Sequence, residues 1–240
     1  MGRKLLWLML FTSTCLYSWP ERPDRDQYYF VTLGRCGTTW LIYCIQQLTQ
    51  IPIHGPKKLL RRSYTSLDVE REPIYFSHDP MMCETVNMSN NYLITIVRDY
   101  REIICRYKNL GNEVTPNYYD YYLNYLKLYE RWDAKKRILI RYEDLITQPR
   151  QVLVDLLLFL KQDTDRLDVF MDNFEFHRQK SLKQYDNRSK SYSRGNDVRF
   201  HSRSVPIRAI KHFDKTMQKT AGPVIWKKYL KQYCTELNKE

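Results

Sequence analysis

Short apolar runs alternate with stretches of helical periodicity along most of the chain. Runs rich in aromatic and β-branched residues predict buried strands at 28–33, 73–78, 91–97 and 137–142. Apolar residues at helical spacing predict helices at 38–50, 101–110, 116–134, 149–161, 164–174 and 221–238. Strands that alternate with helices form a parallel sheet with helices on both faces. The pattern therefore predicts a single α/β domain.

One long segment departs from this alternation. Residues 178–215 combine many Lys and Arg residues with Ser, Asn and Gly. This composition predicts a long basic loop before the last helix. A generic solvated segment and part of a binding site are both compatible with it.

The first 19 residues differ from the rest of the chain. A basic pair, Arg3 and Lys4, precedes a mostly apolar stretch at 5–19, which predicts a secretory signal. A short uncleaved anchor and a hydrophobic segment packed on the core are the alternatives. A signal would place the protein in an exported, secretory or periplasmic compartment, and without one it would be cytoplasmic. We expect membrane contact only if this segment is retained, and a domain at 20–240.

Composition narrows the class of protein. A chain of 240 residues with 43% hydrophobic content can bury a core, which excludes wholesale disorder. Six Cys are too few for a disulfide scaffold, and neither they nor the five His have the spacing of metal ligands. The net charge of +12 suits a nucleic acid, an anionic lipid surface or a polyanionic small ligand. Motifs must decide among these partners.

The stretch after the first predicted strand has the composition of an anion-binding turn. Gly34 and Gly37 bound a tight loop, and Thr38 and Thr39 open the following helix. A helix N-terminus presents unpaired N–H groups and the positive end of the helix dipole, and glycines let backbone approach an anion closely. Thr38 stands where a nucleotide-hydrolysing P-loop has its Lys. The loop therefore predicts phosphate binding and argues against a kinase or other P-loop NTPase.

The sequence LGRCGTTWL closely resembles the phosphosulfate-binding loop of sulfotransferases that use 3′-phosphoadenylyl sulfate (PAPS). Arg35 takes the place of the family's Lys or Arg, and Cys36 takes the place of its Ser. The following residues match the family pattern directly: Gly37, Thr38, Thr39 and Trp40. The resemblance implies a P-loop-like α/β fold in which this loop holds the 5′-phosphate.

Four further stretches match the family in order. NYLITIVRDYREIICRYKN places Arg98 at the position that binds the 3′-phosphate, with Arg106 in place of the family's Ser. IYFSHDP places His78 at the catalytic base, with Phe76 in place of a Lys. LIRYEDL places Tyr142 near the adenine, and RSVPIRAIKHF, a weaker match, places Arg203 over the 3′-phosphate.

The resemblance implies transfer of a sulfuryl group from PAPS to a hydroxyl or amine, leaving 3′,5′-adenosine bisphosphate (PAP). His78 would take the acceptor's proton, and Arg35 would neutralise the departing bridging oxygen. Positioning and electrostatics would supply most of the catalysis, without a metal. The acceptor could be a small molecule, a glycan or a peptide tyrosine, and no motif indicates nucleic acid. Oligomeric state cannot be inferred.

Ordinary structural roles stand beside these assignments. His78 could be a plain strand-end residue, and Arg98 could pair with a nearby acid. Trp40 and Tyr142 could belong to the core, and Arg106 could lie on a solvated helix face. A non-catalytic module that holds a nucleotide or polyanion on the same fold is therefore the alternative function.

Overall fold

A parallel sheet forms the centre of the computed structural model, which describes residues 26–55, 71–83, 86, 88, 90–109, 117–186 and 205–235. The sheet has five strands in the order β2-β3-β1-β4-β5. The strands are β1 (Tyr28–Val31), β2 (Ile53–His54), β3 (Ile74–Ser77), β4 (Tyr92–Val97) and β5 (Arg137–Arg141). Every neighbouring pair is parallel. The side chains of β1 and β3 are almost fully buried, as expected of central strands covered on both faces.

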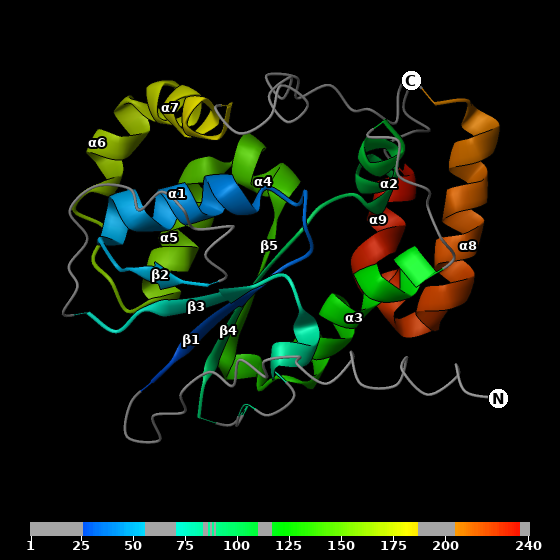
Figure 1. Ribbon diagram of the computed structural model, residues 1–240, viewed down its shortest axis with the longest axis horizontal. Coiled ribbons are helices and arrows are strands. Elements are labelled where there is room, and N and C mark those ends of the chain that lie inside the picture. The colour runs from blue at the N-terminus through cyan, green and yellow to red at the C-terminus, as the bar shows by residue number, and fades with distance from the viewer. Residues whose placement is uncertain are drawn as a thin grey trace, which may run out of the picture.

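Helices cover both faces of this sheet (Figure 1). The helices above it in the view are α1 (Thr38–Thr49), α4 (Tyr142–Thr147), α5 (Pro149–Phe159), α6 (Leu167–Asp172) and α7 (Phe174–Asp186). Below it α3 (Asn117–Arg131) packs on β4. To one side lie α2 (Tyr100–Asn109), α8 (Ile207–Ile225) and α9 (Lys231–Thr235). The short elements η1 (Pro80–Cys83), η2 (Ala134–Lys136) and η4 (Trp226–Leu230) complete the described part.

Parallel pairing brings the predicted motifs to one edge of the sheet. Since all five strands run in the same direction, their carboxyl ends share this edge. β1 lies between β3 and β4, so the loop that follows β1 is flanked by the residues that follow its two neighbours. His78 follows β3, and Arg98 follows β4. The sheet order therefore places three stretches that are far apart in sequence at one place.

The predicted strands and most predicted helices are confirmed to within a few residues, while one prediction is wrong and two short elements were not predicted. β2 and α4 are additional short elements. The predicted loop at 178–215 is wrong at 178–186, which belong to α7, and at 207–215, which belong to α8. Arg203 and the first 19 residues lie outside the described residues, so predictions about them stay predictions.

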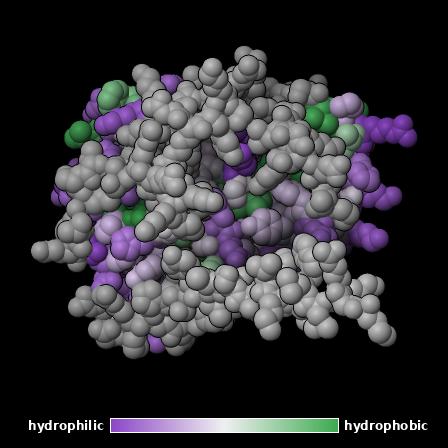
Figure 2. All heavy atoms as spheres, viewed as in Figure 1, coloured by the Kyte–Doolittle hydropathy of each residue, from purple (hydrophilic) through white to green (hydrophobic). Residues whose placement is uncertain are grey.

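α8 is helical because apolar residues recur along one of its faces. Ile210, Phe213 and Met217 are buried at helical spacing, and cations lie exposed on the opposite face at Arg208, Lys211, Lys215 and Lys219. Figure 2 shows hydrophilic side chains projecting at the edge where α8 lies. Part of the basic surplus is thus an ordinary solvated helix face. None of the described helices is long and apolar enough to cross a membrane.

Candidate active site

The loop between β1 and α1 has the backbone of a tight anion-binding turn. Gly37 precedes α1 with φ of 91°, a conformation that favours glycine, and no side chain caps the helix there. A Cβ on Gly37 would lie 2.2 Å from Cδ2 of Tyr142. Arg35 also has a positive φ, 73°, which is uncommon for a residue with a side chain. The turn is therefore held in a conformation that only the surrounding packing maintains.

Thr32 fixes this loop to both neighbouring strands. Its N–H donates to the carbonyl of Ser77 at 3.2 Å, and its hydroxyl donates to the carbonyl of Ile96 at 2.9 Å. Its own carbonyl lies 2.6 Å from Nδ1 of His78. Thr32 thus connects the ends of β1, β3 and β4 just before the loop begins.

The ring of His78 is held in its neutral form. Because a carbonyl only accepts, its Nδ1 carries the hydrogen, and Nε2 is left to accept a proton. Burial lowers the pKa of His78 below 6.5, the bond to Thr32 raises it, and the charge of Arg35 lowers it further. The neutral ring therefore predominates at pH 7. The influence of Arg35 also means that this loop cation and the ring of His78 lie near each other.

Two arginines approach the loop, Arg98 from the turn after β4 and Arg106 from α2. Arg98 is 5% exposed, and its guanidinium lies 4.2 Å from the centre of the Tyr142 ring, which packs on Gly37. Burial lowers the pKa of Arg106 to about 10, and the charge of Arg98 contributes to the shift. Arg98 and Arg106 therefore form a cationic pair beside the loop, and Arg106 does not lie on a fully solvated face. Arg98 also pairs at 4.0 Å with Glu102, so its structural role as an ion-pair partner is real too.

The polar atoms of this region suit a polyanion. Thr38 Oγ1, Arg98 Nε and Arg106 Nε are buried without a hydrogen-bond partner within the described part of the chain. Buried donors are almost always satisfied, so such a group calls for a ligand or water. The three atoms belong to residues that the family resemblance assigns to the 5′- and 3′-phosphates. The residues present therefore fit a bisphosphorylated nucleotide.

The other predicted loop residues occupy different positions. Cys36 is 1% exposed, and burial raises the pKa of its thiol to about 12, so it acts as a small core residue. Thr39 is half-buried at the start of α1. The Trp40 indole is 7% exposed and stacks on Tyr43 and Phe170. Core packing thus accounts for Trp40, and its contact with adenine stays a prediction.

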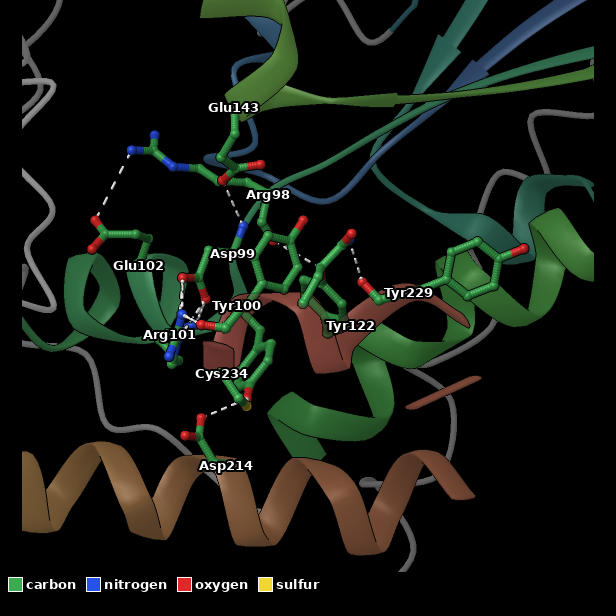
Figure 3. A network of polar contacts seen from close by, with 12 residues as sticks. Arg98, Asp99, Tyr100, Arg101, Glu102, Tyr122, Glu143, Asp214, Tyr229 and Cys234 are labelled. Carbon is green, nitrogen blue, oxygen red and sulfur yellow. Dashed lines mark hydrogen bonds and ion pairs between the residues drawn. The ribbon is translucent and has the colours of Figure 1, made fainter. Parts of the chain in front are cut away.

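A buried charge network lies behind Arg98 (Figure 3). Asp99 caps α2 by accepting from the N–H of Arg101 at 2.9 Å, and it binds the Arg101 guanidinium at 2.8 Å. The N–H of Asp99 donates to Glu143 at 2.9 Å, and Arg101 also donates to the carbonyl of Tyr233. Burial raises the pKa of Asp99, although its bonds to Arg101 oppose the shift. This network ties the turn after β4 to α4 and to the C-terminal helix.

Sequence reasoning missed several residues that hold the site in place. They are Thr32, Asp99, Arg101, Glu143 and three tyrosines of α3, Tyr121, Tyr122 and Tyr125. The tyrosines recur at helical spacing in a helix that was expected, but spacing alone does not distinguish core packing from hydroxyl bonding. Among the described residues no group of His, Cys, Asp and Glu could hold a metal ion.

Comparison with known proteins identifies the family. The family model for the sulfotransferase domain matches residues 74–231, which is more than half of the chain. The protein belongs to the sulfotransferase domain family. The loop at 34–37 lies before the matched stretch, so its assignment rests on the sequence resemblance and the geometry. No curated protein matches the chain.

Solved structures confirm the fold. Mouse sulfotransferase SULT7A1, complexed with PAP, superposes with a TM-score of 0.62 at 14% identity, covering 91% of this chain and 92% of that one. Retinol dehydratase in a complex with retinol and PAP gives a TM-score of 0.57 at 11% identity, covering 85% and 83%. The same protein with androsterone and inactive cofactor PAP gives 0.56 at 11% identity, covering 85% and 82%. At these identities the likeness establishes the fold alone, and the predicted α/β sulfotransferase fold is confirmed.

Proposed function

We propose that the protein transfers the sulfuryl group of PAPS to a hydroxyl or amine acceptor, with His78 as general base. The observation that carries this proposal is the bond from His78 Nδ1 to the Thr32 carbonyl. It anchors the base to the residue that leads into the anion-binding loop, and it leaves Nε2 to take a proton. Membership of the sulfotransferase family and the PAP complexes of structurally similar proteins support the donor.

Different groups of the site would bind different parts of the nucleotide. N–H groups at the start of α1, with the hydroxyls of Thr38 and Thr39, would bind the 5′-phosphate. Arg98 and Arg106 would bind the 3′-phosphate, and their mutual repulsion would be relieved by its two negative charges. Arg35 would stabilise the charge that develops on the bridging oxygen. Arg203, if it reaches the site, would cover the 3′-phosphate.

The acceptor end of the site departs from the family pattern. Phe76 replaces a Lys, is 1% exposed and packs edge-on against His78 at 5.0 Å between ring centres. The site therefore has one cation fewer beside the sulfuryl group, and the base has an apolar neighbour instead. Retinol and androsterone, the compounds in the retinol dehydratase complexes, both carry a hydroxyl, which favours a small-molecule acceptor. A glycan or a peptide tyrosine remains an alternative for the acceptor screen.

Calorimetric titration with PAP tests the nucleotide site. We expect binding in the micromolar range or tighter, weakened at least tenfold, about 1.4 kcal/mol, by Arg98→Ala. Arg150→Ala is the matched control, because Arg150 is exposed and pairs with the exposed Asp168. Absence of PAP binding by a folded sample would contradict the proposal.

Substitution of His78 distinguishes an enzyme from a non-catalytic binding module. Transfer from labelled PAPS to a panel of phenols, alcohols and amines should be abolished by His78→Gln while PAP affinity stays within about twofold, since the side chain acts on the acceptor's proton. A non-catalytic module on the same fold would bind PAP in both forms and transfer sulfate in neither.

A further inference from the structure

Helix α3 contacts the backbone of both site-bearing strand ends through tyrosine hydroxyls. Tyr122 donates to the carbonyl of Arg98 at 2.8 Å. Tyr121 donates to the carbonyl of His78 at 2.7 Å, and the Tyr125 hydroxyl contacts the same oxygen. The oxygens of Tyr121 and Tyr125 are 2.9 Å apart. One turn of one helix thus reaches the residue that carries the proposed base and the residue that carries the proposed phosphate ligand.

The buried hydroxyls of Tyr122 and Tyr125 are protonated donors throughout the physiological range. Tyr122 and Tyr125 are each 2% exposed, and burial raises both of their pKa values far above that of a free phenol. Tyr121 is 40% exposed, so water can replace its bond more easily. A strand-end carbonyl that loses its only buried donor would be left unsatisfied, which destabilises the position of that strand end. The contacts therefore matter most at Tyr122 and Tyr125.

The peptide unit after Arg98 is held from both sides. Its carbonyl accepts from Tyr122, and its N–H, which belongs to Asp99, donates to Glu143. Figure 3 shows Tyr122 and Glu143 on opposite sides of this turn. Rotation of this peptide would break both bonds, so the direction in which the Arg98 side chain leaves the backbone is fixed.

The geometry that α3 holds is not set by strand pairing alone. His78 follows β3 and Arg98 follows β4, and these strands are separated by β1. Two strand spacings correspond to roughly 9.6 Å. The base must nonetheless be aligned with a nucleotide held by Arg98, and misplacement by about 1 Å can cost a factor of about 100 in rate. A helix bonded to both ends provides a rigid reference across the intervening loop.

We propose that α3 positions the two halves of the site through separate hydroxyls, Tyr122 for Arg98, and Tyr121 with Tyr125 for His78. This inference rests on the proposed function, because it assigns the tyrosines to the nucleotide and to proton transfer. They act through His78 and Arg98 and are positioning residues. The two sets of bonds are independent, so their losses should affect different steps.

A crossed pair of variants tests this division. Tyr122→Phe should raise the Kd for PAP about fivefold, the loss expected for one hydrogen bond, with kcat within about twofold. The double variant Tyr121→Phe/Tyr125→Phe should lower kcat about tenfold or more, with the Kd for PAP unchanged, and should move the pKa of His78, followed by NMR of labelled histidine. Tyr119→Phe is the matched control, because this buried tyrosine of the same helix contacts neither carbonyl.

Each variant carries its own test of folding, because each is expected to keep one of the two functions intact. Parallel losses of PAP affinity and kcat in both variants, or no loss in either, would overturn the positioning role while the proposed function stands. Failure of the unchanged protein to bind PAP would overturn both. Restoring one tyrosine of the double variant, Tyr125, should recover most of kcat, since its buried hydroxyl contacts the His78 carbonyl.

Discussion

The ends of β4 and β3 face the same loop but differ in chemical character. Buried charges surround the β4 end: Arg98 is 5% exposed, Asp99 4% and Arg101 2%. At the β3 end the neighbours of His78 are the aromatic side chain of Phe76 and tyrosine hydroxyls on its carbonyl. Each arrangement suits one protonation state. Under the proposed function Arg98 must stay charged to bind an anion, and acids such as Glu102 balance it. His78 must stay neutral to act as a base, which an apolar contact favours.

Because of this difference, substitutions at the two strand ends should affect different properties of the protein. Charges buried at the β4 end are paired with one another, so the loss of one leaves its partner uncompensated. The β3 end holds no such pair among the described residues, and its variants should act on chemistry more than on folding. Four experiments test this difference.

Breaking the buried pair should have the largest effect on stability. Asp99→Ala leaves the Arg101 guanidinium without its carboxylate and removes the cap of α2, so we expect a loss of about 3–5 kcal/mol in the free energy of unfolding. Urea denaturation measures it. Asp144→Ala is the control, because its pair with Arg141 is long, 3.8 Å, and partly exposed, and should cost less than about 1 kcal/mol. Equal losses in the two variants would contradict the role of burial.

Substitution of Gly37 in the loop should give the next largest loss in the free energy of unfolding. Gly37→Ala adds a Cβ that overlaps the Tyr142 ring at 2.2 Å and also forces a positive φ on alanine. We expect a loss of about 2–4 kcal/mol in the free energy of unfolding, with PAP binding abolished because Tyr142 and the loop must move apart.

Gly222→Ala isolates the backbone contribution. Gly222 also has a positive φ, 70°, but nothing lies within 4 Å of the position that a Cβ would take there. Its φ of 70° and ψ of 169° are adopted almost only by glycine, so its substitution should cost about 1–3 kcal/mol while leaving PAP affinity unchanged. If Gly222→Ala weakened PAP binding as much as Gly37→Ala, contact with Tyr142 would not explain the effect.

Arg106 should show a smaller effect with opposite signs on stability and binding. Arg106→Ser restores the residue type of the family pattern and removes a cation whose pKa burial and Arg98 lower to about 10. We expect a higher Tm without ligand and a Kd for PAP raised about fivefold to tenfold. Arg208→Ser, at an exposed cation of α8, is the control for loss of charge. A lower Tm together with unchanged affinity would assign Arg106 a purely structural role.

The smallest expected effect is a shift in the pKa of His78, which can be followed through the pH dependence of kcat/KM. In the unliganded protein its pKa should lie below 6.5, so kcat/KM should rise as pH increases through that value and be flat above pH 7. Because burial is the main cause and Arg35 only adds to it, Arg35→Ala should move the NMR midpoint upward without returning it fully to 6.5. A downward movement in that variant would contradict the proximity of the loop cation.

How far the sequence predicts the fold depends on the element. The strands at 74–77 and 92–97 were predictable because continuous β-branched and aromatic runs suit only buried positions. The part of α8 before residue 221 was missed because Ser, Asn and Gly dominate the segment before it, although Ile210, Phe213 and Met217 follow helical spacing. Local composition outweighed periodicity in that prediction, whereas in the protein the burial of one face decides.

Some residues of the candidate site could likewise be predicted from the sequence, and others could not. Gly37, Thr38 and Arg98 were recognisable because loop chemistry and strand ends are local in sequence. Residue order alone specifies the succession of strands and helices, the glycines of the turn and the residue types available for an anion and a proton. Packing in three dimensions establishes that Thr32 holds the ring of His78 and that α3 donates to the carbonyls of His78 and Arg98. These bonds join residues dozens of positions apart, and side-chain donors reach backbone acceptors at such separations only after the sheet and α3 have packed.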